Sequence, residues 1–360
     1  MLKDPVDLQS VHRVLVTKLR HHGDVLLASP VFTVLKNHAP HLEVDALVYA
    51  DTAAMLSGNP AIAQVFGIDR GWKGLGLAAQ ARAEWGLLQQ LRRRDYDLLI
   101  HLSEHPRGAW LARLLAPRHG VAANHPRVRN WWKKSFTHLY PLPMNGRRHV
   151  VETNLDALRR IGVRPGESER ALCFVPGEEA EREVAGMLAG LGLAPGGYIH
   201  LHPASRWQFK CWTAEKTAEL IDLLQASGQR VLVTAAPDAG ELDLIARIRA
   251  HARTPFADLC GKLTLKQLGA ISRNARLFVG VDSAPMHIAS AMQTPVVALF
   301  GPSGEFNWGP WQVAHRVVAS GHSCRPCGND GCGGGKLSEC LSTLPVAEVL
   351  QAVLALQPHC

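Results

Sequence analysis

The feature of this sequence that most limits its fold is a repeated alternation of short apolar runs with amphipathic stretches. Runs rich in Val, Ile and Leu are typical of parallel strands buried on both faces, and the amphipathic stretches are typical of the helices that cover them. The first half has expected strands at 14–18, 44–49, 96–102 and 120–123, with helices near 30–36 and 81–93. The second half repeats the pattern, with strands at 198–202, 230–235, 277–282 and 295–300 and helices near 213–226, 240–251 and 266–272. We therefore expect an α/β protein with two similar halves.

A segment rich in Pro and Gly separates these halves. It spans 163–196 and holds the pairs Pro165–Gly166, Pro176–Gly177 and Pro195–Gly196 around a weak strand at 171–175 and an acidic helix. A chain of 360 residues is long enough for two cores. We expect a first domain at 1–165, a linker region at 166–196, a second domain at 197–345 and a C-terminal helix at 346–360. Ligands of open α/β sheets bind beyond the carboxyl ends of the strands, so residues that follow each strand are the candidates for function.

The charge balance favours a polyanionic partner. Lys and Arg total 39 against 31 Asp and Glu, which gives a formal charge of +8. The basic residues are spread out, only 6% of the chain is aromatic, and no nucleic-acid-binding motif is present, so nucleic acid is not the expected partner. The first residues, MLKDPVDLQS, lack the apolar core of a signal peptide, and no run of about 18 apolar residues occurs. We expect a cytoplasmic protein.

The loop after the first strand carries a candidate base. Here Gly23 is expected to allow a tight turn, and Asp24 follows it at the carboxyl end of the strand. Asp24 is equally well explained as a turn or helix-start residue, and both interpretations stay open. The chain has no Gly-x-Gly-x-x-Gly in this loop, which argues against a dinucleotide-dependent dehydrogenase.

The first loop of the second half is a candidate phosphate site. It follows the strand that ends at His202 and holds one hydroxyl and two cations, Ser205, Arg206 and Lys210. Such groups, together with backbone N–H groups at a helix start, suit a pyrophosphate. The alternative is a solvated basic loop. Three aromatic residues of the loop argue against that alternative: Trp207, Phe209 and Trp212.

A second candidate loop follows the strand at 277–282. Ser283 is expected to cap the next helix and Pro285 to occupy its first turn. Capping does not account for Asp282 and His287, which are placed to hold a sugar hydroxyl and a phosphate oxygen beside the positive helix terminus.

Two motifs raise the question of a metal. Asp95 and Asp97 form an Asp-x-Asp motif, but it precedes a strand instead of following one, so we interpret it as a turn and expect no catalytic metal. The second motif consists of Cys324, Cys327, Cys332 and Cys340. These residues have the composition of a structural zinc or iron–sulfur site, although their spacing fits no standard zinc finger. A structural metal and reduced thiols both stay open.

Basic residues also gather beside two tryptophans in the first half. We call four of them the basic quartet: Arg127, Arg129, Lys133 and Lys134. Together they are candidates to hold an anionic acceptor, and Trp131 and Trp132 are candidates to contact sugar faces or a membrane interface.

Five separated segments resemble one known family. They are LRHHGDVLLASP (19–30), WKKSFTHL (132–139), VETNL (151–155), FKCW (209–212) and GVDSAPMHIA (280–289). On these segments the chain resembles glycosyltransferase family 9, the lipopolysaccharide core heptosyltransferases, and within it the heptosyltransferase III branch. The resemblance spans nearly the whole chain.

The resemblance implies a GT-B fold, with two Rossmann-like domains whose parallel sheets face a central cleft. It also implies inverting, metal-independent transfer of heptose from ADP-L-glycero-β-D-manno-heptose to the lipopolysaccharide inner core, placing heptose III on heptose II at the cytoplasmic face of the inner membrane, without a cofactor. Asp24 matches the family's catalytic Asp. The first domain would bind the acceptor through the basic quartet. The second would bind the donor through Ser205, Arg206, Lys210, Asp282, Ser283 and His287, with Asp238 or Glu241 on the ribose and Leu263 near the adenine.

Three alternatives remain. One is another core heptosyltransferase, of the heptosyltransferase II type. Another is a non-catalytic protein of the same fold that binds a nucleotide sugar or a polyanion, against which Asp24 argues. The third is a nucleotide-sugar epimerase of GT-B fold, which needs additional carboxylates in the cleft.

Overall fold

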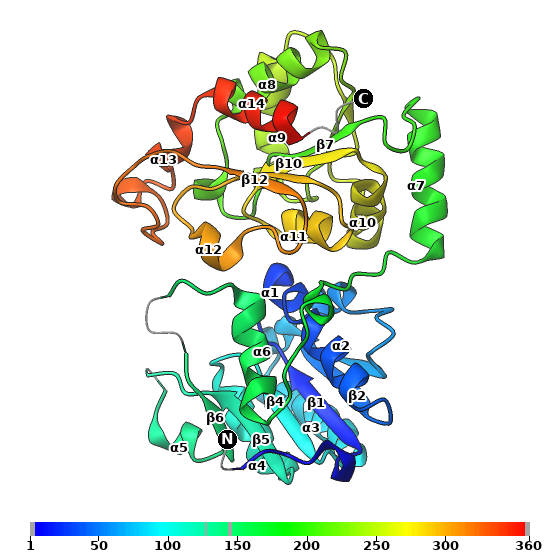
Figure 1. Ribbon diagram of the computed structural model, residues 1–360, viewed down its shortest axis with the longest axis vertical. Helices are drawn as coiled ribbons and strands as arrows, with labels where there is room; N and C mark the ends of the chain where they lie inside the picture. The colour runs from blue at the N-terminus through cyan, green and yellow to red at the C-terminus, as the bar shows by residue number, and fades with distance from the viewer. Residues whose placement is uncertain (1–3, 127, 143–145, 357–360) are drawn as a thin grey trace. The chain divides into compact units, whose positions relative to one another are not determined.

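The chain folds into two α/β units, as Figure 1 shows. The computed structural model describes residues 4–126, 128–142 and 146–356. The first unit ends at Val175 and the second begins at Pro176. Each unit contains one six-stranded sheet in which every pair of neighbouring strands is parallel. The expected α/β class with two similar halves is confirmed.

The sheet of the first unit has the strand order β3-β2-β1-β4-β5-β6. Its strands are β1 (Arg13–Thr17), β2 (Glu43–Tyr49), β3 (Gln64–Ile68), β4 (Leu98–His101), β5 (His119–Ala123) and β6 (His138–Tyr140). Val14 of β1 is in register with Val44 of β2 on one side and with Leu98 of β4 on the other. The chain order reverses between β1 and β4, so the loop after β1, which carries Asp24, begins at the topological switch where such sheets bind ligands.

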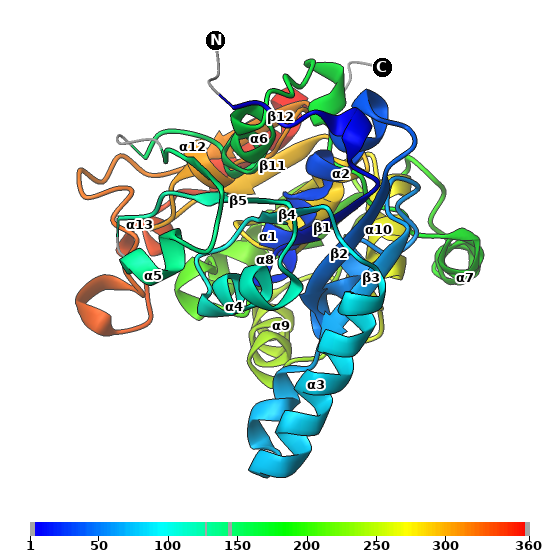
Figure 2. The ribbon, with the colours of Figure 1, turned by 90° about the horizontal axis from the view of Figure 1, so that it is seen from below.

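Helices cover both faces of this sheet. They are α1 (His22–Leu26), α2 (Ser29–His38), α3 (Leu77–Arg93), α4 (Pro106–Leu115), α5 (Asn130–Lys133) and α6 (Val150–Arg160), with short 3₁₀ turns η1 (Leu8–Ser10), η2 (Ala50–Met55), η3 (Arg70–Gly74) and η4 (Ser168–Arg170). On α6 the buried residues Val151, Leu155 and Leu158 recur at helical spacing, which is why this stretch packs as a helix. Figure 2 shows α3 beside β3, with its first turns extending past the strands.

The second unit repeats the arrangement, with strand order β12-β11-β10-β7-β8-β9. Its strands are β7 (Ile199–His202), β8 (Val231–Val233), β9 (Ala257–Asp258), β10 (Leu277–Val281), β11 (Val296–Leu299) and β12 (His315–Val318). Its helices are α7 (Glu178–Gly190), α8 (Ala214–Ala226), α9 (Ala239–His251), α10 (Leu265–Asn274), α11 (Ala284–Ala291), α12 (Glu305–Trp308), α13 (Glu339–Ser342) and α14 (Val346–Leu356), with η5 (Gln208–Lys210) and η6 (Cys332–Gly334). The switch lies between β7 and β10, so both candidate donor loops start there.

Two local expectations differ from the structure. Residues 171–175 do not form a strand: Leu172 and Phe174 are buried, and the N–H of Cys173 donates to Ser29 Oγ at 2.9 Å instead of to a neighbouring strand. Within the expected linker region 166–196, α7 packs through Val184 and Leu188 on the core of the second unit. Its amphipathic pattern makes α7 a part of that unit.

No helix in the described ranges has the length and the hydropathy that a membrane span needs.

Candidate active site

Asp24 lies in the first turn of α1, just beyond the carboxyl end of β1. Gly23 is part of the same helix, so the expected tight turn at this glycine is wrong. The Asp24 side chain is 14% exposed, and its Oδ1 lies 3.9 Å from Nε of Arg20. The carboxylate is therefore partly enclosed, and one cation lies beside it.

Sequence reasoning missed a second cation near Asp24. Lys18 is buried at the end of β1, and its Nζ donates to the carbonyl oxygen of Leu102 at 2.9 Å and to Asn154 Oδ1 at 3.0 Å. Burial lowers the pKa of Lys18 to about 8, while the nearby Asp24 carboxylate acts to raise it. Lys18 is thus still charged near neutral pH and places positive charge beside Asp24.

Asn154 connects this cation to the loop that carries Asp24. Its Nδ2 donates to the carbonyl oxygen of Leu27 at 2.9 Å, while its Oδ1 accepts from Lys18. One buried side chain of α6 therefore fastens the end of β1 and the link between α1 and α2. Asn154 belongs to the VETNL segment, and a buried polar residue inside a matched motif was the signal that could have identified it.

In the second unit, the loop after β7 is anchored by aromatic side chains. Phe209 and Trp212 are buried, and Trp212 Nε1 donates to the carbonyl oxygen of Leu344 at 3.3 Å. These two aromatic residues anchor the loop in the core, which agrees with the argument against a merely solvated loop and does not by itself indicate ligand binding. Trp207 alone of the three is exposed, with Cζ of Arg206 5.6 Å from the centre of its ring.

The same loop carries two further predicted donor residues, Ser205 and Lys210. Ser205 is buried, and its Oγ accepts from the N–H of Trp207 at 3.2 Å. Lys210 Nζ lies 2.6 Å from Asp282 Oδ2, and these side chains are 22% and 6% exposed. The structure therefore joins the loops after β7 and β10 through an ion pair between two residues that sequence analysis assigned to different ligand groups.

Helix α11 begins directly after Asp282. Ser283 occupies the N-cap position, but its hydroxyl donates to the carbonyl oxygen of Val281 at 3.3 Å and makes no hydrogen bond to the helix, so the predicted side-chain cap is wrong. Pro285 lies in the first turn as predicted, and His287 is buried. Gly280 precedes this loop at a position where a Cβ atom would lie 2.8 Å from the carbonyl oxygen of His202, which favours glycine there.

The two candidate ribose acids differ in environment. Asp238 is exposed and caps α9, with Oδ1 accepting from the N–H groups of Gly240 at 2.9 Å and Glu241 at 3.3 Å. Glu241 is buried, and its Oε2 accepts from the N–H of Ala236 at 2.9 Å and lies 3.8 Å from Nε2 of His202. Burial raises the pKa of Glu241 and lowers the pKa of His202 to about 3, so this contact involves a neutral imidazole.

Leu263 is partly buried in the loop between β9 and α10. It packs against the core cluster that includes Tyr198 and Ile271. Its place after the carboxyl end of β9 is on the sheet edge where ligands of this fold bind.

Three members of the basic quartet lie at the two ends of α5. Arg129 holds its N-cap position, and Lys133 and Lys134 stand at its carboxyl end; Arg127 lies outside the described residues. Trp132 is buried in the core of the first unit, so its predicted contact with sugars or a membrane is wrong. Trp131 is only partly buried.

The Asp-x-Asp motif lies at the opposite end of the first sheet from Asp24. Asp97 Oδ2 accepts from the N–H groups of His12 at 2.7 Å and Arg13 at 3.1 Å, at the amino ends of β1 and β4. Asp95 has a left-handed backbone, with φ of 48°. Asp95 and Asp97 therefore have structural roles at the start of β4: Asp95 forms the turn, and Asp97 caps the amino end of β1.

The cysteine motif lies near α13. Three of its residues are exposed and Cys340 is buried; burial raises the pKa of the Cys340 thiol, and the neighbouring thiols raise it further. Among the described residues, no three His, Cys, Asp or Glu side chains are arranged to hold a metal ion. The segment is tied to the loop after β7, because Ser338 Oγ donates to the carbonyl oxygen of Phe209 at 2.6 Å.

Two doubly wound units, each with polar side chains at the switch of its sheet, define the fold class as GT-B. Solved structures share this fold. A glycosyltransferase family 9 protein from Veillonella parvula aligns with a TM-score of 0.82 at 23% identity, over 96% of this chain and 97% of that one. E. coli ADP-heptose lps heptosyltransferase II aligns with a TM-score of 0.75 at 19% identity, over 96% of this chain and 98% of its own.

The sequence identifies the family. The model of glycosyltransferase family 9 (heptosyltransferase) matches residues 85–337. Lipopolysaccharide heptosyltransferase 3 of Escherichia coli K12 is 37% identical over 295 residues, which cover 81% of this chain and 83% of that protein. The chain belongs to glycosyltransferase family 9, and the protein is a glycosyltransferase of the heptosyltransferase type.

Proposed function

We propose that this enzyme transfers heptose from ADP-L-glycero-β-D-manno-heptose to the inner core of lipopolysaccharide, with inversion and without a metal. The observation that carries the proposal is the 37% identity to E. coli lipopolysaccharide heptosyltransferase 3 over 81% of the chain. The same observation favours heptose II as the acceptor sugar, so that the product carries heptose III. The acceptor is lipid-linked, and the enzyme meets it at the cytoplasmic face of the inner membrane.

In this proposal the second unit, which begins at Pro176, binds the donor. Lys210, Arg206 and the amino terminus of α11 are the positive groups that offset the charge of the pyrophosphate, and Ser205 and His287 donate hydrogen bonds to it. Asp282 holds the Lys210 ammonium in place at 2.6 Å. Glu241 or Asp238 binds the ribose, and Leu263 contacts the adenine. The resemblance to solved E. coli WaaC with ADP, at a TM-score of 0.73 and 20% identity, supports the fold that this assignment needs.

Asp24 acts as the general base. Its carboxylate removes the proton of the acceptor hydroxyl while that oxygen attacks the anomeric carbon, and the bond from this carbon to the diphosphate oxygen breaks. Such help contributes about 10²–10⁴ in rate. Because the charge of the departing ADP develops without a metal, fixed cations and dipoles must stabilise it.

The first unit, which ends at Val175, binds the acceptor. The inner core carries phosphates and carboxylates, and the basic quartet supplies the matching positive charge. Each exposed cation contributes modestly, about 1 kcal/mol near an anionic surface. The quartet therefore acts as a set.

The experiment that tests the base is Asp24→Asn, with core lipopolysaccharide from a strain lacking the protein as the acceptor. We expect ADP release to fall by at least about 100-fold while ADP-heptose binding by calorimetry stays nearly unchanged. Asp51→Asn is the matched control, because Asp51 is an exposed carboxylate in the same unit. Comparable turnover of Asp24→Asn and the parent would show that Asp24 only starts a helix.

The acceptor sugar is tested in cells. Mass spectrometry of the lipopolysaccharide core from the deletion strain should show the loss of one heptose, and linkage analysis should show heptose II without its branch. An unchanged core would refute the function, and a truncation before heptose II would favour a heptosyltransferase of type II.

A further inference from the structure

In the described part of the first unit, exposed large apolar side chains are confined to a few neighbouring elements. In the described ranges of this unit, the exposed large hydrophobic residues all belong to η3, α3, α4 and their borders: Leu75, Leu77, Trp85, Trp110 and Leu114. Leu77 is 89% exposed, and Trp85 and Trp110 are each more than half exposed, at 54% and 56%. We call these five residues the α3–α4 face. A gathered apolar surface of this kind marks an interaction site more often than scattered apolar residues do.

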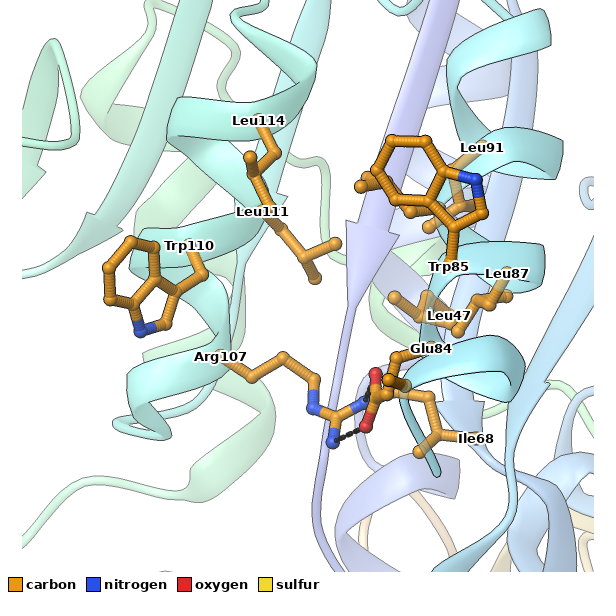
Figure 3. Close-up of a pocket in the computed structure, with 12 residues that line it drawn as sticks. Leu47, Ile68, Glu84, Trp85, Leu87, Leu91, Arg107, Trp110, Leu111 and Leu114 are labelled. Atoms are coloured by element: carbon orange, nitrogen blue, oxygen red, sulfur yellow. Dashed lines mark hydrogen bonds and ion pairs between the residues drawn. The ribbon is translucent and has the colours of Figure 1, made fainter. Parts of the chain in front are cut away.

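A cavity of about 220 Å³ opens between α3 and α4 at this face, as Figure 3 shows. Leu88, Leu91 and Leu111 are among its lining residues, and the two exposed tryptophans stand on opposite sides of it. The ion pair of Arg107 and Glu84, with Nη2 and Oε1 2.6 Å apart, borders the cavity. The apolar surface is therefore hollowed as well as exposed.

Cations outnumber acids on the elements of the α3–α4 face, with exposed acids at their borders in Asp69, Asp95 and Glu104. Residues 70–94 contain one acid, Glu84, which pairs with Arg107, and residues 106–134 contain none. Exposed cations stand on the same elements and just beyond them, namely Lys73, Arg82, Arg92, Arg93, Arg113 and Arg118. Such a surface complements a dense layer of negative charge.

Aromatic and cationic side chains also alternate here. Cζ of Arg92 lies 5.8 Å from the centre of the Trp85 ring, and Cζ of Arg113 lies 5.6 Å from that of Trp131. The rings of Trp110 and Trp131 are 5.7 Å apart. Tryptophan prefers the boundary between headgroups and acyl chains, and arginine pairs with lipid phosphates just outside it.

We propose that the α3–α4 face binds the surface of an anionic phospholipid bilayer. Leu77, Trp85 and Trp110 enter the headgroup boundary, and the surrounding cations meet the lipid phosphates. Charge complementarity favours this partner over a protein, because exposed cations outnumber acids around the apolar centre and the one acid among the cavity's lining residues, Glu84, is paired with Arg107. The inference rests on the proposed function in one respect: membrane attachment would bring the enzyme to a lipid-linked acceptor.

The test uses the full-length protein and sedimentation with two kinds of vesicle: phosphatidylcholine alone, and equal parts phosphatidylcholine and phosphatidylglycerol. We expect binding to the anionic vesicles, a blue shift of tryptophan emission on binding, and release at high salt. Trp85→Ser/Trp110→Ser should weaken this binding at least about tenfold, and Arg92→Gln/Arg93→Gln should weaken it on anionic vesicles. The matched controls Leu242→Ser/Leu354→Ser and Arg182→Gln change exposed residues of the second unit and should bind like the parent.

Activity separates attachment from catalysis. The face variants should keep the parent's turnover on a deacylated, water-soluble core acceptor and lose it on acceptor embedded in anionic vesicles. Vesicle binding needs neither donor nor acceptor, so it is measured independently of the proposed reaction. Equal binding to both vesicle types, or unchanged binding by both face variants, would overturn the proposal. So would a parent that ignores vesicles and forms dimers that Trp85→Ser/Trp110→Ser dissociates, because the face would then be a protein interface.

Discussion

The contact between Lys210 and Asp282 makes one substitution especially informative. Lys210→Met removes the ammonium that lies 2.6 Å from Asp282 Oδ2 and leaves a carboxylate that is only 6% exposed without that partner. The variant therefore loses a cation for the pyrophosphate and gains an uncompensated negative charge close to where the pyrophosphate is proposed to bind. We expect lower stability and much weaker ADP binding.

The two effects have different sizes. Removing one partner of a buried ion pair costs about 3–5 kcal/mol, and we expect the lower end because the Lys210 side chain is 22% exposed. Loss of a charge-assisted hydrogen bond to phosphate costs about 1.5–3 kcal/mol, which corresponds to about 10- to 150-fold in the Kd for ADP. Repulsion from Asp282 adds to that loss.

The double variant Lys210→Met/Asp282→Asn separates these contributions. Because it removes both charges, we expect it to recover most of the stability and to bind ADP more tightly than Lys210→Met, yet more weakly than the parent. Urea unfolding and calorimetry with ADP measure the two quantities, and Lys262→Met is the control for an exposed lysine of the same unit. Parent-like ADP affinity in Lys210→Met would refute the phosphate assignment, and a double variant weaker than the single one would refute the role of Asp282.

Three further predictions follow from the site. Burial lowers the pKa of Lys18 from 10.5 to about 8, so the unfolded chain binds a proton there more tightly than the folded protein does. Parent stability should therefore rise relative to Lys18→Met by about 3 kcal/mol as pH increases from 8 to 10.5, and parallel urea titrations would show no such divergence if Lys18 were unperturbed. Turnover should survive EDTA, and a loss that Mg²⁺ or Mn²⁺ restores would contradict metal independence, whereas a fall in melting temperature alone would indicate a metal at the cysteine motif. Replacing the basic quartet by Ala should raise the acceptor KM more than tenfold, leave the donor KM unchanged and flatten the salt dependence of the acceptor KM; a changed donor KM would reverse the assignment of the two domains.

The sequence predicted the central strands well because burial on both faces makes them nearly continuous apolar runs. The edge strands β3, β6, β9 and β12 escaped prediction: they are short or carry exposed residues, and β9 has only the two residues Ala257 and Asp258. Their pairing depends on a neighbouring strand already in place, which local patterning does not encode. The extended segment at 171–175 shows the reverse error, since its apolar residues are buried without joining a sheet.

Candidate site residues were easiest to predict where the chain leaves a strand. Such residues stand at the binding edge whatever their partners are, so Asp24, Ser205 and Asp282 could be selected from strand ends alone. The contacts between side chains could not be predicted from the sequence. The contacts of Lys18 with Asn154 and of Lys210 with Asp282 join residues 136 and 72 positions apart, and only the packed fold brings them together.

These partnerships give the two units separable roles. In the second unit, Asp282 fixes the cation proposed for the leaving group, so changes there should act on donor affinity as well as on rate. In the first unit, Asn154 and Lys18 fix and charge the surroundings of Asp24, and neither is proposed to touch the nucleotide. A substitution such as Asn154→Ala should then lower turnover by loosening the loop of α1 while ADP still binds like the parent. The Asn154 side chain, and not a bound ligand, holds the link between α1 and α2 in place. The variant should therefore lose turnover while the second unit keeps its affinity for ADP.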